Sequence, residues 1–475
     1  MIKNICIQGL GFVGIATATV VASVKNKNGY PKYNVIGVEL DTPEGRRKIE
    51  SINNGELYFA CDDEDFKIKL KEAVLKNKNF VATSENDVYN KADVVLVAVR
   101  LDVKKNINDY FKSEVLIEAF KRAIKTLGER IKPDCLIIIE TTLPPGTTKK
   151  IVEKILLKEF KKRNINSPPF ICHSYERVTP GKNYINSIIN FYRNYSTNNK
   201  TAKVKAELFL NSIINTKNYS LTHFNNTDAT EIAKILENSY RAVNIAFIYE
   251  WTLLAEKIGV NLFEIIEVIK QRRGTHDNIM KPGFGVGGYC LPKDALLAQW
   301  GLRNLFNIKN LYLEFSIKGI KINDKMPLHV YDLIIQEIGS IKNKIVLICG
   351  ASYLPEVFDL RNTPTKILYD KIKSEGGICH ISDPFLENTD NYFDEEDIHI
   401  NNTLNQYDVI IYAVRYQKYL DLDPFSIIKD LKDDILIVDA FNIFNDDKIR
   451  FFLRNNINII GIGKGHIKKM KDVLI

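Results

Sequence analysis

The first forty residues carry the pattern that most restricts how this chain can fold. An apolar run at residues 5–7 leads into the glycine motif GLGFVG at residues 9–14. An Ala-, Thr- and Val-rich stretch and a second apolar run from Asn34 to Glu39 follow. Such glycines allow a tight strand-to-helix turn, and an acid after the second strand accepts hydrogen bonds from ribose hydroxyls. The pattern predicts a doubly wound α/β domain that binds a dinucleotide at a helix N-terminus.

We expect the motif and the acid to contact the cofactor directly, and the acid favours NAD over NADP. The expected contact residues are Gly9, Gly11, Phe12, Val13, Gly14 and Glu39. Further strand-like runs at 94–99 and 136–140 alternate with lysine-rich helical stretches, which predicts a parallel sheet with helices on both faces. The polar stretch 194–200 is expected to be a loop.

Residues from about 225 to 310 differ, because apolar side chains recur there at helical spacing. Asp228, with Glu231 three residues later, is the expected N-cap of a long amphipathic helix. Such a helix between two domains is a candidate dimer interface. Strand-like runs resume at Lys344, so we expect two Rossmann-like doubly wound domains joined by a central helical domain. The expected domain boundaries are 1–205, 206–330 and 331–475.

Composition limits the classes of function. The 475 residues include 66 basic and 58 acidic side chains, mixed along the chain without the basic arm or aromatic patch of a nucleic-acid binder. No apolar stretch is long enough to span a membrane, and we expect a cytoplasmic protein. The seven cysteines show no paired spacing, so neither a disulfide framework nor a metal site is expected.

A second informative stretch is PGFGVGGYCLPKD at residues 282–294. Its four glycines would let the backbone approach a ligand closely. Cys290 follows them, and the charged pair Lys293 and Asp294 comes just behind. A cationic neighbour favours the thiolate form of a nucleophilic cysteine. The alternative interpretation is a glycine-rich turn with a buried structural cysteine.

Two more polar groups lie far from this loop in the sequence. Lys234 and Asn238 are one turn apart on the predicted central helix, where both can donate hydrogen bonds to a developing oxyanion. The segment ETTLPPGTT at residues 140–148 follows a predicted strand, at the edge where open α/β sheets bind ligands. The alternatives are a solvated Lys–Asn pair, and a Pro-Gly turn in which Thr147 or Thr148 caps the next helix.

Together these motifs resemble the UDP-glucose/GDP-mannose dehydrogenase family, the nucleotide-sugar 6-dehydrogenases. The resemblance covers nearly the whole chain, and the loop ending in Cys-Leu-Pro-Lys-Asp is its most specific motif. Other matches are the Lys234/Asn238 helix, TLPPGT from Thr142, ERVTPG from Glu176, DLRNTP from Asp359 and DAFN from Asp439. The resemblance implies a four-electron oxidation of the sugar C6 alcohol to the uronate with NAD. Cys290 would hold the intermediate aldehyde as a thiohemiacetal and then as a thioester.

The resemblance also implies roles for other residues. Lys234 and Asn238 would stabilise oxyanions. Asp294 and Glu176, with Thr142, would position water and move protons, and Thr142 would also contact the cofactor. The implied substrate-binding residues are Glu176, Arg177, Lys234, Asn238, Arg272, Arg273, Phe284, Gly285, Gly287, Lys293 and Arg361.

Three departures from the family pattern surround the sugar and base pockets. Pro180 stands near the place where relatives that oxidise UDP-glucose carry a second Glu, and ERVTPG is more like relatives that act on UDP-N-acetylhexosamines. The segment YLPE at 353–356 lacks a family lysine, and a family proline is missing after Val99, where residues 100–101 are Arg-Leu. UDP-glucose and a UDP-N-acetylhexosamine therefore both remain open as substrates.

Three other functions remain as alternatives. They are a GDP-mannose 6-dehydrogenase, a single-step β-hydroxyacid-type dehydrogenase that needs no Cys290, and a non-catalytic regulator that binds NAD or a sugar nucleotide. An arginine at 272–273 would reach the nucleotide sugar of a neighbouring subunit, as in relatives. We therefore expect a homodimer.

Overall fold

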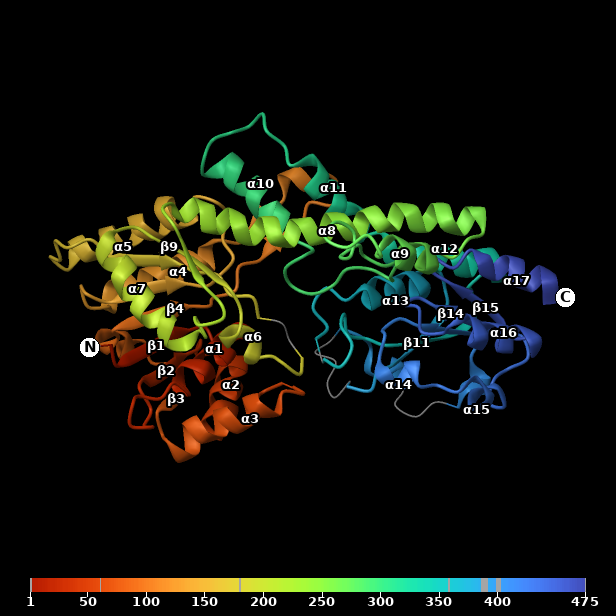
Figure 1. The fold of residues 1–475 in the computed structure, drawn as a ribbon, viewed down its shortest axis with the longest axis horizontal. Coiled ribbons are helices and arrows are strands. Elements are labelled where there is room, and N and C mark those ends of the chain that lie inside the picture. Colours follow the sequence, from red (N-terminus) through yellow and green to blue (C-terminus); the bar gives the residue numbers. More distant parts are fainter. Residues whose placement is uncertain are drawn as a thin grey trace. The chain divides into compact units, whose positions relative to one another are not determined.

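The computed structural model describes residues 2–59, 61–178, 181–357, 359–385, 392–398 and 403–474. The chain divides into two compact units, each built around its own sheet (Figure 1). The first unit consists of Met1–Glu237 and Lys293–Leu313, and the second of Asn238–Pro292 and Glu314–Ile475. Domain boundaries near residues 205 and 330 stay a prediction.

The first unit contains an eight-stranded sheet in the order β10-β9-β8-β7-β4-β1-β2-β3. Its strands are β1 (Asn4–Gln8), β2 (Asn34–Val38), β3 (Phe80–Thr83), β4 (Val94–Val97), β7 (Leu136–Ile139), β8 (Phe170–His173), β9 (Arg193–Thr197) and β10 (Leu221–Phe224). The strands from β3 to β8 are parallel, which confirms the predicted doubly wound sheet. At the far edge β9 is antiparallel to β8 and parallel to β10, so the whole sheet is mixed.

Strand β1 shows how the sequence produces two layers of helices. Ile5 and Ile7 lie in the core shared with α1 (Phe12–Ala22), whereas Cys6 lies in the opposite core, shared with α4 (Glu118–Arg130). Successive strand side chains point to opposite faces, so a strand that is apolar throughout must be covered on both. The other helices of this unit are α2 (Pro43–Asn53), α3 (Glu64–Lys71), α5 (Glu153–Lys162), α6 (Asn186–Ile189), α7 (Lys200–Ile213) and α10 (Asp294–Asn304).

The polar stretch 194–200 is not the loop that composition predicts, because most of it is strand β9. Tyr195 and Ser196 are buried in this strand, and the guanidinium of Arg193 at its start is buried against the carboxylate of Glu140. Polar residues can form a core strand when each charge finds a buried partner. That partner lies 53 positions away in the chain, beyond the reach of local composition.

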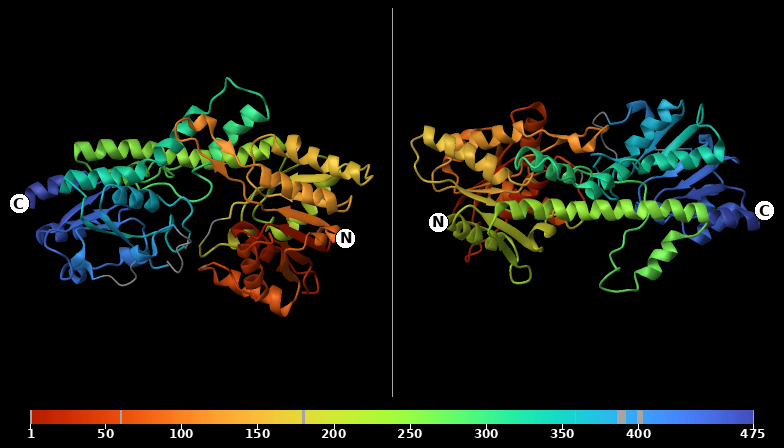
Figure 2. Two further views of the ribbon diagram at one scale, coloured as in Figure 1. Left: turned by 180° about the vertical axis from the view of Figure 1, so that it is seen from behind. Right: turned by 90° about the horizontal axis from the view of Figure 1, so that it is seen from above.

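The predicted long helix is confirmed as α8 (Thr227–Ile258), a single helix of 32 residues (Figure 2). It begins one residue before Asp228, so Asp228 lies in its first turn and is not its N-cap. After α9 (Leu262–Ile269), residues 270–293 form turns and irregular chain. The middle of the protein is therefore less helical than the apolar spacing predicts.

The second unit contains a five-stranded parallel sheet in the order β12-β11-β13-β14-β15, which confirms the second α/β fold. Its strands are β11 (Ile345–Cys349), β12 (Ile378–Ser382), β13 (Val409–Tyr412), β14 (Leu436–Asp439) and β15 (Asn458–Gly461). Its helices, besides α9 and most of α8, are α11 (Glu314–Asn323), α12 (Met326–Ile338), α13 (Pro364–Ser374), α14 (Gln417–Leu420), α15 (Pro424–Ile428), α16 (Asp446–Arg454) and α17 (His466–Leu474). Val346 and Leu347 enter opposite cores, as Ile5 and Cys6 do in the first sheet.

Candidate active site

The glycine motif lies between β1 and α1, at the carboxyl edge of the first sheet. Gly9 has φ +90°, and a Cβ on Gly14 would lie 1.9 Å from the carbonyl oxygen of Gly9. Both positions therefore require glycine for the turn itself. A Cβ on Gly11 would meet no atom within 4 Å, so this glycine leaves space beside the loop. The first turn of α1 has no acidic side chain and no side-chain cap, which suits a bound pyrophosphate.

Glu39 follows β2 and holds the same loop in place. Its carboxylate accepts hydrogen bonds from the backbone N–H of Leu10 and of Leu40, both at 2.9 Å. The side chain is half-buried, and a carboxylate has lone pairs for further donors such as ribose hydroxyls. An open glycine, an uncapped helix N-terminus and a carboxylate after β2 together fit NAD. Phe12 and Val13 lie in the first turn of α1, beside this space.

The segment after β7 is held by a buried carboxylate on α8. Glu231 accepts hydrogen bonds from the backbone N–H of Gly146 at 2.6 Å and from the N–H and hydroxyl of Thr148 at 2.7 Å. Burial raises the pKa of Glu231 to about 8, although these donors favour the charged form. The expected capping box therefore does not form. Thr147 donates its hydroxyl to the carbonyl of Pro144, so neither threonine caps the following helical turn.

Lys234 lies three residues after Glu231 and meets the segment that follows β8. Its Nζ donates to the backbone carbonyl of Glu176 at 2.8 Å and lies 3.9 Å from Glu176 Oε1. The two residues are 7% and 9% exposed, and the ring of Tyr175 lies 5.5 Å from the ammonium. The fold thus brings a predicted oxyanion donor beside a predicted carboxylate. Asn238 is buried one turn further along α8.

A buried ion pair that the sequence does not predict lies next to these segments. Arg193 bonds to the carboxylate of Glu140 and donates to the hydroxyl and carbonyl of Ser174, both at 3.0 Å. Burial raises the pKa of Glu140, while Arg193 opposes the shift. Glu140 precedes the half-buried Thr142 by two residues, and Ser174 precedes Glu176 by two. The pair therefore ties together the two segments that carry predicted catalytic residues, and no local pattern announces it.

Lys293 and Asp294 begin α10 as a buried ion pair. Lys293 Nζ lies 3.1 Å from Asp294 Oδ1, and the residues are 6% and 0% exposed. The charge of Lys293 is therefore compensated by its neighbour in the chain. Cys290, three residues earlier, is half-buried and belongs to the second unit.

The glycines before Cys290 pack against protein. A Cβ on Gly285 would lie 2.8 Å from Pro364, and a Cβ on Gly287 would lie 2.4 Å from Tyr353 Cβ. Phe284, predicted to contact the substrate, is 1% exposed in the core of the second sheet. The structure shows a protein neighbour at both positions, and a contact of these glycines with substrate stays a prediction. Their small size admits the segment that joins β11 to α13.

The same segment holds the end of the loop. Gly288, with φ +82°, donates its N–H to the carbonyl of Arg361 at 2.8 Å, and its own carbonyl accepts from Asn362 Nδ2 at 2.9 Å. Arg361 forms a bidentate ion pair with Asp359, in which Nε lies 2.8 Å from Oδ1, and its guanidinium lies 5.6 Å from the ring of Tyr289. This arginine, predicted to bind substrate, thus braces the cysteine loop.

The other predicted arginines have different surroundings. Arg177 pairs with Glu237 at 2.8 Å and donates to the hydroxyl of Tyr175 at 3.0 Å. Arg272 and Arg273 are exposed in the turn after α9. Pro180, which stands in place of a family glutamate, lies outside the described residues.

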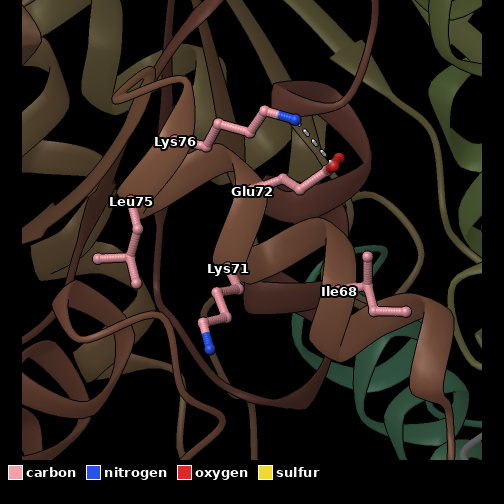
Figure 3. Close-up of a pocket in the computed structure, with 5 residues that line it drawn as sticks. All are labelled: Ile68, Lys71, Glu72, Leu75 and Lys76. Atoms are coloured by element: carbon pink, nitrogen blue, oxygen red, sulfur yellow. Dashed lines mark ion pairs between the residues drawn. The ribbon is translucent and has the colours of Figure 1, made fainter.

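A surface pocket lies in the first unit, on α3 and the π-helical turn that follows it (Figure 3). It is lined by Ile68, Lys71, Glu72, Leu75 and Lys76, and none of the predicted site residues borders it. In the part of the chain that the structure describes, no group of three or more His, Cys, Asp or Glu is placed to hold a metal. No described helix combines the length and apolarity needed to cross a bilayer.

Three family models match this chain. The NAD-binding domain of the UDP-glucose/GDP-mannose dehydrogenase family matches residues 3–209, its central domain residues 228–324 and its UDP-binding domain residues 347–446. A UDP-N-acetyl-D-mannosamine dehydrogenase from Pyrococcus horikoshii is 26% identical over 98% of this chain and 100% of its own length. Another from Methanocaldococcus jannaschii is 28% identical over 93% of each chain. The structure of a UDP-glucose dehydrogenase from Pyrobaculum islandicum, 17% identical, superposes with a TM-score of 0.79 over 94% of this chain and 96% of that one.

Proposed function

We propose UDP-N-acetyl-D-mannosamine as the substrate of this protein. The premise is that the chain belongs to the UDP-glucose/GDP-mannose dehydrogenase family and oxidises a nucleotide sugar with NAD. The observation that carries the proposal is full-length similarity to dehydrogenases of that name. The similarity to a UDP-glucose dehydrogenase supports the fold alone. The GDP-mannose, single-step and regulator alternatives are not favoured by these similarities.

The sequence around Glu176 supports an N-acetylated sugar. The run ERVTPG places Pro180 where a second glutamate would favour UDP-glucose. An acetamido group is bulkier than the hydroxyl it replaces and ends in a methyl group, and a proline in place of a carboxylate suits that exchange. UDP-glucose is therefore the competing substrate that an experiment must separate.

We propose that the reaction passes through Cys290. The C6 alcohol loses a hydride and a proton to become an aldehyde, and the thiolate adds to it to form a thiohemiacetal. A second loss of hydride and proton leaves a thioester, and water then releases the uronate and restores the thiol. Two NAD⁺ accept the two hydrides, so one sugar yields two NADH and two protons from the oxidations.

The buried groups of the first unit have the chemistry that these steps require. Lys234 can stabilise a developing alkoxide in a site where its charge is largely desolvated. Glu176 lies beside it and can position water or accept a proton. We assign Asn238, Asp294 and Thr142 the supporting roles that the family resemblance implies.

We also propose a homodimer formed through α8. Five large apolar side chains are 47–58% exposed on this helix in the second unit. They are Tyr240, Phe247, Trp251, Leu254 and Ile258. Their separations of seven, four, three and four residues follow the seam of a helix pair. A second copy of the chain offers the same seam, and the exposed Arg272 and Arg273 are available to such a neighbour.

We further propose a cytoplasmic location. Besides Cys290, the other six cysteines are also free thiols, and five of them are buried in the cores of the two units. Unpaired thiols are the usual state in a reducing compartment.

The substrate is tested by measuring NADH release from UDP-N-acetyl-D-mannosamine, UDP-N-acetyl-D-glucosamine, UDP-glucose and GDP-mannose. We expect kcat/KM for UDP-N-acetyl-D-mannosamine to exceed that for UDP-glucose by at least about 100-fold, the size of discrimination that unpaired polar groups in a pocket can produce. A higher kcat/KM for UDP-glucose would overturn the assignment of the sugar.

A further inference from the structure

Two tyrosine hydroxyls from distant parts of the first unit reach the carbonyl groups of the glycine loop. Tyr58, between α2 and α3, donates to the carbonyl of Leu10 at 3.0 Å. Tyr184, just before α6, donates to the carbonyl of Phe12 at 3.1 Å. Helices α3 and α6 both pack beside α1 (Figure 1). Neither tyrosine belongs to a recognisable dinucleotide motif.

An aromatic cluster fixes the two hydroxyls. The ring of Phe59 lies 4.6 Å from that of Phe12, 5.0 Å from that of Tyr58 and 6.2 Å from that of Tyr184. Tyr184 is 1% exposed, and the ammonium of Lys48 lies 5.3 Å from the ring of Tyr58. Rings packed in this way have few alternative rotamers, so their hydroxyls are held in place.

Holding these carbonyls also orients the amides that would face a pyrophosphate. A peptide group is planar, so the carbonyl of one residue and the N–H of the next turn together. Tyr58 therefore fixes the N–H of Gly11, and Tyr184 fixes the N–H of Val13. Glu39 holds the peptide on the other side of Leu10 through its N–H. The loop is thus braced on each side of its open glycine.

We propose that Tyr58 and Tyr184 are positioning residues that set the dinucleotide-binding loop in its binding conformation before the cofactor arrives. Without them, the Leu10–Gly11 and Phe12–Val13 peptides each lose an anchor, and part of the binding free energy must then order the loop. This inference depends on NAD as the cofactor and is independent of the sugar proposed above.

The test compares Tyr58→Phe, Tyr184→Phe and the double variant with Tyr33→Phe. Tyr33 is a matched control, because it is 2% exposed in the same unit and its hydroxyl bonds to Ser212 at 2.7 Å, outside the loop. NADH binding is measured by fluorescence without sugar. We expect each single variant to raise the Kd for NADH by about 3- to 10-fold, the range for one lost hydrogen bond, with a larger rise in the double variant.

Two further readouts separate positioning from general destabilisation. The KM for NAD⁺ should rise in the loop variants while the KM for the sugar stays within about twofold, and Tyr33→Phe should lower the melting temperature without changing the Kd. An unchanged Kd for NADH in the folded double variant would overturn the proposal. A rise in the Kd for NADH in Tyr33→Phe equal to that in the loop variants would also overturn the proposal. Neither result depends on which sugar is oxidised.

Discussion

Glu231 illustrates how one buried carboxylate can organise a site without touching substrate. It binds Gly146 and Thr148, and Lys234 lies on the same helix three residues later. Glu231 therefore fixes the position of the segment that carries Thr142 relative to the helix that carries Lys234. Since a misplacement of about 1 Å can cost about 100-fold in rate, this clamp matters for catalysis.

Above its pKa of about 8, Glu231 is a carboxylate that accepts from all three donors, so replacement by Gln should break the clamp there, because the amide NH₂ would face a backbone donor. We expect kcat to fall by about tenfold or more. Thr148→Val removes a single donor and should cause a smaller fall. Steady-state kinetics with saturating NAD⁺ provides the measurement. If kcat is unchanged in the folded Gln variant, the clamp has no role in turnover.

The same residue predicts a pH dependence of stability. The pKa of Glu231 is raised in the folded state from 4.5 to about 8. The folded protein therefore binds its proton more tightly than the unfolded chain, so this contribution to stability is complete below pH 4.5 and is lost as the pH rises through 8. The unfolding free energy of the wild type minus that of Glu231→Gln should fall from pH 5 to pH 8, because only the wild type has a carboxyl group that titrates at this position. Denaturant titrations across this range measure it, and a constant difference contradicts the shift.

Cys290 is the residue on which the proposed four-electron chemistry depends. Cys290→Ala should lower uronate formation by at least about 10³-fold, as removal of a nucleophile does elsewhere. Cys61→Ser is a control at another half-buried thiol and should retain activity. Chromatography of the products gives the result. Uronate formation at the wild-type rate in the Ala variant would show that the second oxidation does not pass through Cys290.

The positions of single site residues were predictable where a local sequence motif is specific for one kind of chemistry. The glycines before α1, together with Glu39, occupy the positions that the motif requires, and Lys234 does meet Glu176. Arg193 was unpredictable, because its partner Glu140 is distant in sequence and each residue alone looks like an exposed charge. The close protein neighbours of Gly285 and Gly287 were unpredictable for a related reason. A glycine has no pattern that distinguishes an approaching ligand from an approaching strand or loop.

At the scale of elements, the β1–α1 turn contains glycines required for two different reasons: Gly14 allows the turn to form, and Gly11 leaves space for the cofactor. Gly14→Ala should destroy the turn, because the new Cβ would lie 1.9 Å from a backbone oxygen that cannot move aside. Gly11→Ala should leave the melting temperature within about 2 °C, since the substitution meets no neighbour and few surface changes exceed about 0.5 kcal/mol. We expect Gly11→Ala to weaken NADH binding by about tenfold or more, because the methyl group would occupy the space left for the pyrophosphate. Normal NADH affinity in Gly11→Ala would contradict this placement of the cofactor.

Most strands could be located from apolar runs, since parallel strands are buried on both faces. The direction of β9 could not, because strand direction depends on the connections and not on side-chain pattern. The boundaries of α8 were nearly predictable from its periodicity. The irregular chain at 270–293 was not, because its turns are stabilised by contacts within the second unit, such as those of Gly288 with the segment before α13.

At the scale of the whole molecule, the exposed seam of α8 predicts the oligomeric state. Trp251→Glu places a charge in the centre of the seam and should shift the protein from dimer to monomer. Leu208→Glu, on the 64% exposed Leu208 of α7, is the matched control and should not. Sedimentation velocity distinguishes the two states. A Trp251→Glu variant that remains a dimer would place the interface elsewhere.

We propose that one enzyme oxidises the nucleotide sugar twice and that Cys290 retains the intermediate between the two steps. The most direct test is the number of NADH molecules formed per sugar when UDP-N-acetyl-D-mannosamine is limiting and NAD⁺ is in excess. We expect two NADH and one uronate per sugar consumed. A ratio of one, with the aldehyde as the product, would contradict it.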